Sequence, residues 1–76
     1  MTIQEIIKKF NEATDLRRAA DFSRKYECEH RAMFLYEDAD EAFALADTAF
    51  DALRERDGLD TADLMRIQEA RACYLA

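Results

Sequence analysis

The chain contains no proline and only one glycine in 76 residues. Tight β-hairpin turns depend on glycine, asparagine and proline for their backbone angles, so a small sheet would have almost nothing from which to build its turns. Half of the residues are hydrophobic and 37% are charged, which is typical of a folded domain rather than a disordered segment. The composition therefore predicts an all-α fold, and residues 1–76 should form a single small helical domain.

The beginning of the chain carries a clear helix signal. Thr2 and Glu5 have the spacing of a capping box, in which a hydroxyl and a carboxylate each bond to the other residue's backbone N–H. Four apolar residues then follow on one helical face: Ile3, Ile6, Ile7 and Phe10. This face fades at Ala13, and Asp15 is a suitable N-cap for a new helix. We therefore expect a short opening helix over about residues 3–13.

Residues 16–36 are helical in composition, although a polar run over residues 27–31 interrupts their apolar face. Asp38 and Glu41 have the spacing of a second capping box, which allows one helix to end near Glu37 and another to begin. A helix that runs straight through this point is the alternative, and periodicity does not decide between the two. The sequence thus predicts three helices, or four if the chain breaks near Glu37.

The most regular pattern in the chain is an apolar stripe along its middle third. Its members are separated by three or four residues: Leu35, Ala39, Ala42, Ala46, Ala49 and Leu53. Three aromatic residues recur every seven positions beside it: Tyr36, Phe43 and Phe50. Alanines along the middle of a stripe leave space for another helix to approach closely, so we expect Ala46 to be buried at a helix contact.

The single glycine, Gly58, stands where this helix should stop. Glycine reaches left-handed backbone angles without steric cost and is the commonest residue just after a helix. Asp60 can then cap a last helix over residues 61–75. Because the connection is short, the two helices should be antiparallel neighbours, which predicts an antiparallel helical hairpin across Gly58.

Small and aromatic residues on both sides of this glycine form a recognisable set: Asp40-Glu41-Ala42, Ala46, Ala49-Phe50, Leu53, the Asp57-Gly58 turn, and Ala70-Arg71-Ala72-Cys73-Tyr74-Leu75-Ala76. With this set, residues 39–76 resemble one tetratricopeptide-like helical hairpin. The resemblance implies close packing of paired helices and a role in protein binding rather than catalysis. It assigns no functional residue.

Three residues have the chemistry of metal ligands or of a catalytic pair: Cys28, His30 and Cys73. Cys-x-His is not a spacing of structural zinc sites, and a closed zinc site needs four ligands. On a helix, residues i and i+2 also point in diverging directions, which separates the thiol from the imidazole. We therefore expect no catalytic residue, no metal site and no cofactor. The two cysteines should be reduced, buried, small hydrophobic residues.

The acidic residues are concentrated in one block. The chain has a net charge of -6, whereas residues 37–63 alone contain ten acids and two bases. Such a charge argues against binding to nucleic acid or to an anionic membrane. The chain has no apolar run near the ~20 residues that span a bilayer and no secretory signal, which predicts a cytoplasmic protein. Five carboxylates on one helical face form the predicted surface for a partner with basic residues: Asp40, Glu41, Asp47, Asp51 and Glu55.

These features predict a non-enzymatic acidic protein that binds a protein partner and regulates or inhibits it. Its size and charge suit a phage- or plasmid-encoded inhibitor, including one that mimics the charge of nucleic acid. One alternative is a structural subunit or assembly chaperone of a larger complex. A second is a small metal-binding or enzymatic domain built on the cysteines and the histidine. Phe34, Leu45 and Ala52 lie outside the main stripe and predict self-association into a homodimer.

Overall fold

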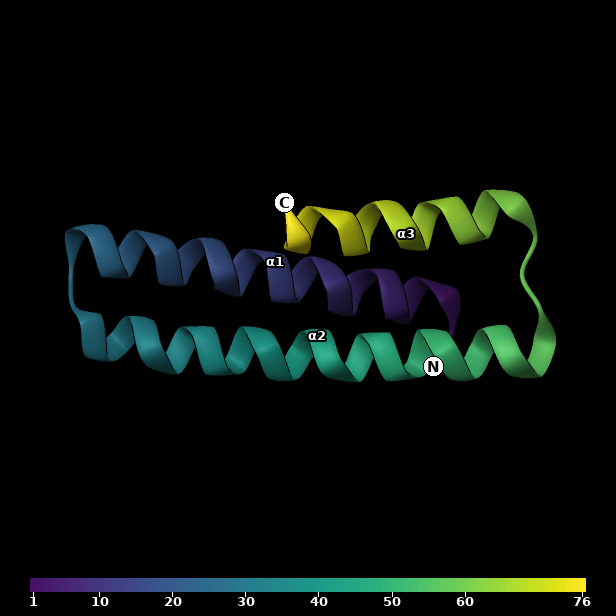
Figure 1. Cartoon of the computed structure of the whole chain (residues 1–76), viewed down its shortest axis with the longest axis horizontal. Helices are drawn as coiled ribbons and strands as arrows, with labels where there is room; N and C mark the ends of the chain where they lie inside the picture. The colour runs from purple at the N-terminus through teal and green to yellow at the C-terminus, as the bar shows by residue number, and fades with distance from the viewer.

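The fold is known from a computed structural model, which describes the backbone of residues 1–76 and every side chain except that of Asp57. It consists of three helices: α1 (Ile3–Tyr26), α2 (Glu29–Asp57) and α3 (Thr61–Leu75). Helices α1 and α2 run antiparallel along the whole length of α1, and α3 turns back along the first half of α1 (Figure 1). The Cα atoms extend over 43 × 17 × 15 Å, so the molecule is a rod. None of these helices, within the described residues, has both the length and the hydropathy needed to cross a membrane.

The all-α fold and the antiparallel hairpin across Gly58 are confirmed. Helix α2 ends at this glycine, whose φ of 65° is the only positive φ among the described residues. Asp60 caps α3 as predicted, because its carboxylate accepts a hydrogen bond from the backbone N–H of Asp63 at 2.8 Å. The two helices that meet here therefore run in opposite directions.

Helix α1 begins with the predicted capping box but is much longer than predicted. Thr2 and Glu5 exchange side-chain-to-backbone hydrogen bonds of 3.2 Å. The expected end near residue 13 is wrong, and Asp15 does not start a new helix. The buried stripe continues past this point, since Ala13 and Ala20 are fully buried at the seven-residue spacing set by Ile6. Packing against α2 therefore carries the helix through a stretch of polar residues.

The break between α1 and α2 falls on Glu27 and Cys28, in the polar run at residues 27–31. Glu27 leaves the helical region with φ -124° and ψ -90°, and Cys28 is extended with φ -147° and ψ 128°. The N–H groups of both residues donate to the carbonyl of Ser23, at 2.9 and 2.8 Å. The turn is thus closed by backbone hydrogen bonds and uses neither glycine nor proline.

Helix α2 continues through Glu37 without a break, so the four-helix alternative is wrong. Its buried residues on the side of α1 recur every seven positions: Ala32, Ala39, Ala46 and Leu53. Because Ala39 is fully buried, the packing contact spans the region where the break was considered. Asp38 is exposed on the helix surface and does not act as an N-cap.

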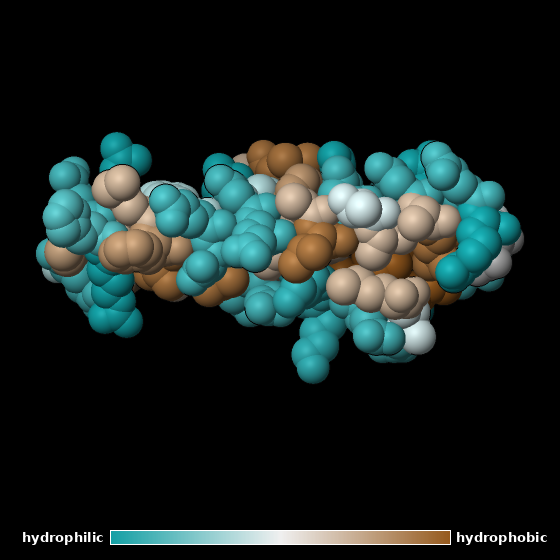
Figure 2. All heavy atoms as spheres, turned by 90° about the horizontal axis from the view of Figure 1, so that it is seen from below, coloured by the Kyte–Doolittle hydropathy of each residue, from teal (hydrophilic) through white to brown (hydrophobic). Residues whose placement is uncertain are grey.

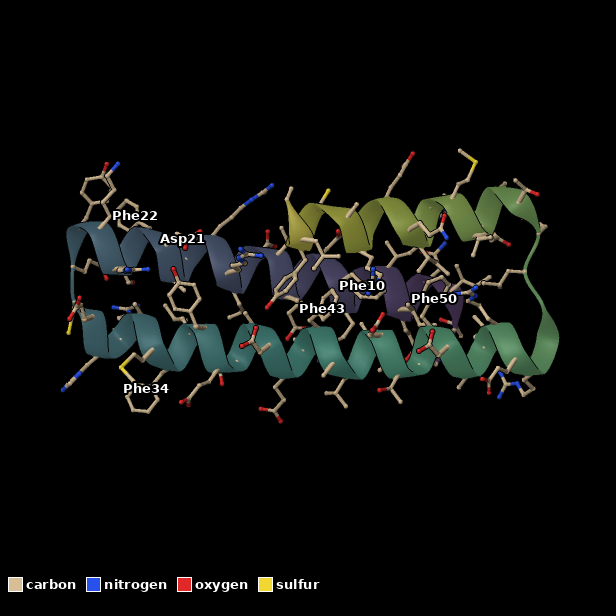
Figure 3. All side chains as sticks on the ribbon, in the orientation of Figure 1. Phe10, Asp21, Phe22, Phe34, Phe43 and Phe50 are labelled. Atoms are coloured by element: carbon tan, nitrogen blue, oxygen red, sulfur yellow. The ribbon has the colours of Figure 1, made fainter. Side chains whose placement is uncertain are left out.

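The hydrophobic core lies in the half of the rod that contains all three helices. One buried cluster joins residues from all of them: Ile6, Phe10, Ala46, Phe50, Leu53, Ile67 and Ala70. Phe10 lies between the helices, with its ring centroid 5.4 Å from that of Phe43 and 6.5 Å from that of Phe50, both in edge-to-face geometry (Figure 3). Such pairs stabilise a core beyond the area that they bury.

The tight contact at Ala46 gives a direct test of the packing. Ala46 is fully buried, whereas Ala44 on the same helix is exposed. Replacing Ala46 by leucine forces extra methyl groups into a filled space and should lower the free energy of unfolding by about 1–3 kcal/mol. The matched Ala44→Leu variant should change it by less than about 0.5 kcal/mol. Urea unfolding followed by circular dichroism measures both, and equal stabilities would contradict the packing described.

Candidate functional site

Helix α3 covers only part of the hairpin formed by α1 and α2. It ends beside Arg17, whose guanidinium donates a hydrogen bond to the backbone carbonyl of Tyr74. Beyond this point α1 and α2 continue as a pair with no third helix beside them (Figure 1). We call this part, residues 18–38, the hairpin tip.

The two helices of the hairpin tip are held together by small residues. Ala20 and Ser23 of α1 and Ala32 of α2 are all buried there. The Ser23 hydroxyl donates to the carboxylate of Glu27 at 3.1 Å, so its buried oxygen is satisfied. Small residues allow two helices to approach closely. The two helices can therefore bury these residues between them without a third helix.

The positions that face α3 change character where α3 ends. On α1, the seven-residue series begins with Ile3 and Phe10 and continues with Arg17 and Arg24. The first two are packed in the core, Arg17 bonds to the end of α3, and Arg24 lines an open pocket beyond it. A charged side chain in place of an apolar one removes the need for a covering helix. The hairpin tip is therefore adapted to solvent on the side where α3 would continue.

A hydrogen bond between the helices takes the place of core packing on this side. The Tyr36 hydroxyl donates to the carboxylate of Asp21, which projects from α1 toward α2 (Figure 3). This bond favours the protonated phenol and raises the pKa of Tyr36 above its ordinary value. Arg24 and Tyr36 also line an open pocket of about 310 Å³ on the same side.

Two aromatic side chains are exposed on the outer surface of the hairpin tip. Phe22 and Tyr26 are 56% and 64% exposed, and their ring centroids lie 5.0 Å apart at an angle of 45°. Phe22 projects away from α2 (Figure 3). The ammonium group of Lys25 lies 5.3 Å from the centre of the Tyr26 ring. We call Phe22 and Tyr26 the aromatic platform, because the two adjacent rings form one accessible apolar surface. The ammonium group of Lys25 borders it.

The hairpin tip also differs in charge from the rest of the chain. Residues 18–38 contain four bases and five acids, for a net charge of -1, which leaves -5 for the remaining residues. Two further large apolar side chains are exposed in this segment, Met33 at 59% and Phe34 at 68%. The hairpin tip therefore combines a nearly balanced charge with exposed apolar groups, whereas the rest of the chain is acidic.

The structure divides the five predicted acidic site residues into two groups. Asp40 accepts a hydrogen bond from the Tyr74 hydroxyl, and Asp47 forms an ion pair of 2.8 Å with Arg71, so both carboxylates hold α3 in place. The other three remain exposed on α2: Glu41, Asp51 and Glu55. Burial of the ring and the bond to Asp40 together raise the pKa of Tyr74 to about 12. Two of the five therefore have a structural contact that sequence reasoning did not identify.

The residues predicted for self-association share one exposed side of α2 but are separated along it by 11 and 7 residues. Phe34 and Leu45 are 68% and 50% exposed, and Ala52 is exposed as well. Along this side of the molecule, apolar areas alternate with hydrophilic ones (Figure 2). The self-association itself stays a prediction.

The cysteines are not buried, which corrects the expectation from the sequence. Cys28 is the N-cap residue of α2 and Cys73 lies on α3; both are exposed, because neither position belongs to a stripe that packs against another helix. His30 is exposed in the first turn of α2. Among the described residues, no three or more histidine, cysteine, aspartate or glutamate side chains are grouped to hold a metal ion.

The aromatic platform was not identified from the sequence, although a signal for it exists. Phe22 and Tyr26 are four residues apart and lie off the stripe of buried residues that runs through Ala13 and Ala20. Two large rings at this spacing, on a helix whose apolar positions become charged, indicate an exposed pair. The exposure of this pair can be inferred only when the end of α3 is known.

Comparisons with protein-family models, with curated protein sequences and with solved structures find no match to this chain.

The contact between Tyr74 and Asp40 predicts a specific dependence of stability on pH. The pKa of Tyr74 is about 12 in the folded chain and about 10 when unfolded, so folding favours the protonated phenol. Its contribution to stability is complete below pH 10 and is lost as the pH rises from 10 to 12. A Tyr74→Phe variant, which cannot ionise, should be less stable than the parent at pH 8 by about 1 kcal/mol. The difference should shrink by pH 11.5 in thermal unfolding, and a constant or growing difference would contradict the assignment.

Proposed function

We propose that this chain is a non-enzymatic protein that binds a protein partner through the hairpin tip and regulates or inhibits that partner. The aromatic platform carries the proposal. Phe22 and Tyr26 expose more than half of their surface although they lie next to each other. Leaving large rings in water forgoes the stabilisation of burial, and neighbouring exposed rings are a feature of interaction sites.

The physical properties of the aromatic platform suit a protein interface. Aromatic side chains contribute large contact areas with few rotatable bonds, and they are enriched among the residues that dominate binding energy. The nearby cations of Arg18 and Lys25 would surround the rings with positive charge. We therefore infer a counterpart with an apolar pocket and an acidic rim. Because the hairpin tip is only two helices thick, it can enter a groove.

The exposed acids of α2 form a competing surface. Asp51 and Glu55 lie side by side with Arg54 on the acidic half of the rod, and they belong to the surface that the sequence predicts for a basic partner. Exposed charges act mainly on the rate of encounter and on the choice of partner. The likeness of residues 39–76 to a protein-binding helical hairpin supports partner binding in general and does not distinguish the two surfaces.

Two matched double variants separate the surfaces. The first, Phe22→Gln with Tyr26→Gln, removes the aromatic platform and keeps good helix formers. The second, Asp51→Asn with Glu55→Gln, neutralises the competing acids. Partners are first captured with the parent chain from the organism that encodes it, and the affinity of each variant for a captured protein is then measured. We expect the first variant to bind about 30-fold more weakly or worse, as for one central aromatic residue worth about 2 kcal/mol.

The second variant should bind within about tenfold of the parent and show a weaker dependence on salt. All four positions are exposed, so both variants should keep the helical spectrum and melting temperature of the parent. Full binding by the first variant together with loss of binding by the second would move the site to the acidic face and refute the proposal.

A further inference from the structure

Helix α2 carries a second stripe with heptad spacing, and all of its members are exposed. They alternate in spacing between three and four residues along almost the whole helix: Arg31, Phe34, Asp38, Glu41, Leu45, Thr48, Ala52 and Glu55. We call this set the outer stripe. The outer stripe thus has the spacing of a helix contact, with three apolar members (Phe34, Leu45 and Ala52) among five polar or charged ones.

The outer stripe lies on the flank of α2 that faces away from α3. Five of its members directly precede a buried residue, as Leu45 precedes Ala46, and two precede the half-buried Leu35 and Ala49. The aromatic row on the side of α3 directly follows that stripe, as Phe43 follows Ala42. Since successive residues on a helix are rotated by about 100°, these two rows lie on opposite sides of the buried contact. No described element of this chain covers the outer stripe.

We propose that the outer stripe docks onto the outer stripe of a second copy of this chain, with the two α2 helices antiparallel. The pairing is isologous, so each contact occurs twice about a two-fold axis near the middle of α2. This inference is independent of the partner of the hairpin tip, because it concerns a different surface and needs no other protein.

The charges and sizes along the stripe are complementary in the register where both 29-residue helices overlap over their full length. Arg31 of one copy then lies opposite Glu55 of the other, at both ends of the contact. Phe34, which is 68% exposed in the single chain, lies opposite the small side chain of Ala52. A large residue facing a small one and opposite charges facing each other are the pairings that stabilise antiparallel helices.

Neighbouring registers are disfavoured by like charges. Moving one helix by one heptad in one direction places Asp38 opposite Glu41, and moving it in the other direction places Asp38 opposite Glu55. In the full-overlap register Asp38 instead faces Thr48, a hydroxyl that can donate to its carboxylate. Like charges that face each other cost free energy, so they select this register over the two alternatives.

In the middle of the contact an apolar side chain faces the methylene groups of a charged one. Leu45 lies opposite Glu41 of the second copy, where the methylene groups of the glutamate can cover it. Lys9 and Glu12 of α1 line the same shallow pocket of about 310 Å³ as Asp38 and Glu41, and they form an ion pair of 3.2 Å with each other. Because Glu12 already pairs with this ammonium group, Lys9 offsets only part of the repulsion between Asp38, Glu41 and a second acidic helix.

The dimer leaves both aromatic platforms accessible. Phe22 and Phe34 project in opposite directions from the rod (Figure 3). Because the two α2 helices are antiparallel, the two hairpin tips lie at opposite ends of the dimer. The assembly would therefore present two binding sites that face apart, which would permit bivalent binding to a partner with repeated sites.

The test is a charge exchange in the complete chain, read by sedimentation equilibrium. The parent should have twice the 8.8 kDa mass of the chain at micromolar concentration. The single variants Arg31→Glu and Glu55→Arg each replace two attractive pairs by two repulsive ones, and each should raise the dimer dissociation constant by about tenfold. The double variant with both changes restores opposite charges and should return the constant to within about threefold of the parent value.

Recovery in the double variant would identify a contact between copies. Residues 31 and 55 are 24 positions apart on one helix, which is about 36 Å at 1.5 Å per residue, so they cannot pair within one chain. Arg31 does form an exposed ion pair of 3.6 Å with Glu27, but a change at residue 55 cannot repair the loss of that pair. Lys8→Glu, the same change of charge at an exposed position of α1, is the matched control and should leave the dimer intact.

Two results would overturn the proposal. One is a parent chain that stays monomeric up to about 100 µM, well above the micromolar dissociation constants of weak dimers. The other is a dimer that the single changes do not weaken, or that the double change does not restore. In the second case a Phe22→Gln, Tyr26→Gln variant distinguishes a contact through the hairpin tips, because that variant would then be monomeric.

Discussion

The close pairing of α1 and α2 along their small residues is the contact on which the rest of the structure depends. Ala13 and Ala20 on one helix and Ala39 and Ala46 on the other are fully buried, so the two backbones lie near each other along the rod. Alanine loses no side-chain entropy when it is buried, but it also removes little apolar surface from water. The larger hydrophobic contribution must come from elsewhere, and the ring of Phe10 with α3 provides it in one half of the molecule.

This division explains why the two halves of the rod differ. In the covered half, Tyr74 stacks on Phe43 with ring centroids 4.4 Å apart, and its hydroxyl and carbonyl bond to both other helices. In the hairpin tip, the bond from Tyr36 to Asp21 and a buried strip of small residues replace that packing. A two-helix segment can bury only its inner side, which leaves the outer rings of Phe22 and Tyr26 exposed and available to a partner.

Much of the fold follows from local patterns, whereas the site depends on how the helices are rotated against each other. The capping box, the alanine stripe and the turn at Gly58 are local signals, and each was predicted. Asp15 and Asp38 resemble N-caps but lie inside helices, because the buried stripe passes through both positions. The break at residues 27–28 has no glycine or proline to mark it. That Asp40 and Asp47 contact α3 depends on its tertiary placement, which no spacing along the chain reveals.

Helices α1 and α2 stay paired to the end of the hairpin tip without a third helix. Hydrogen exchange of the backbone amides, resolved by residue in the complete chain, tests this pairing most directly. We expect strong protection at Ala20, Ser23 and Ala32. Their amides should exchange at least about a hundredfold more slowly than in an unfolded chain, as for local opening that costs about 3 kcal/mol. The contradicting result is exchange at unfolded rates in the hairpin tip, with protection only in the half covered by α3. It would show that α1 and α2 do not stay paired there and that the aromatic platform does not lie on an ordered helix.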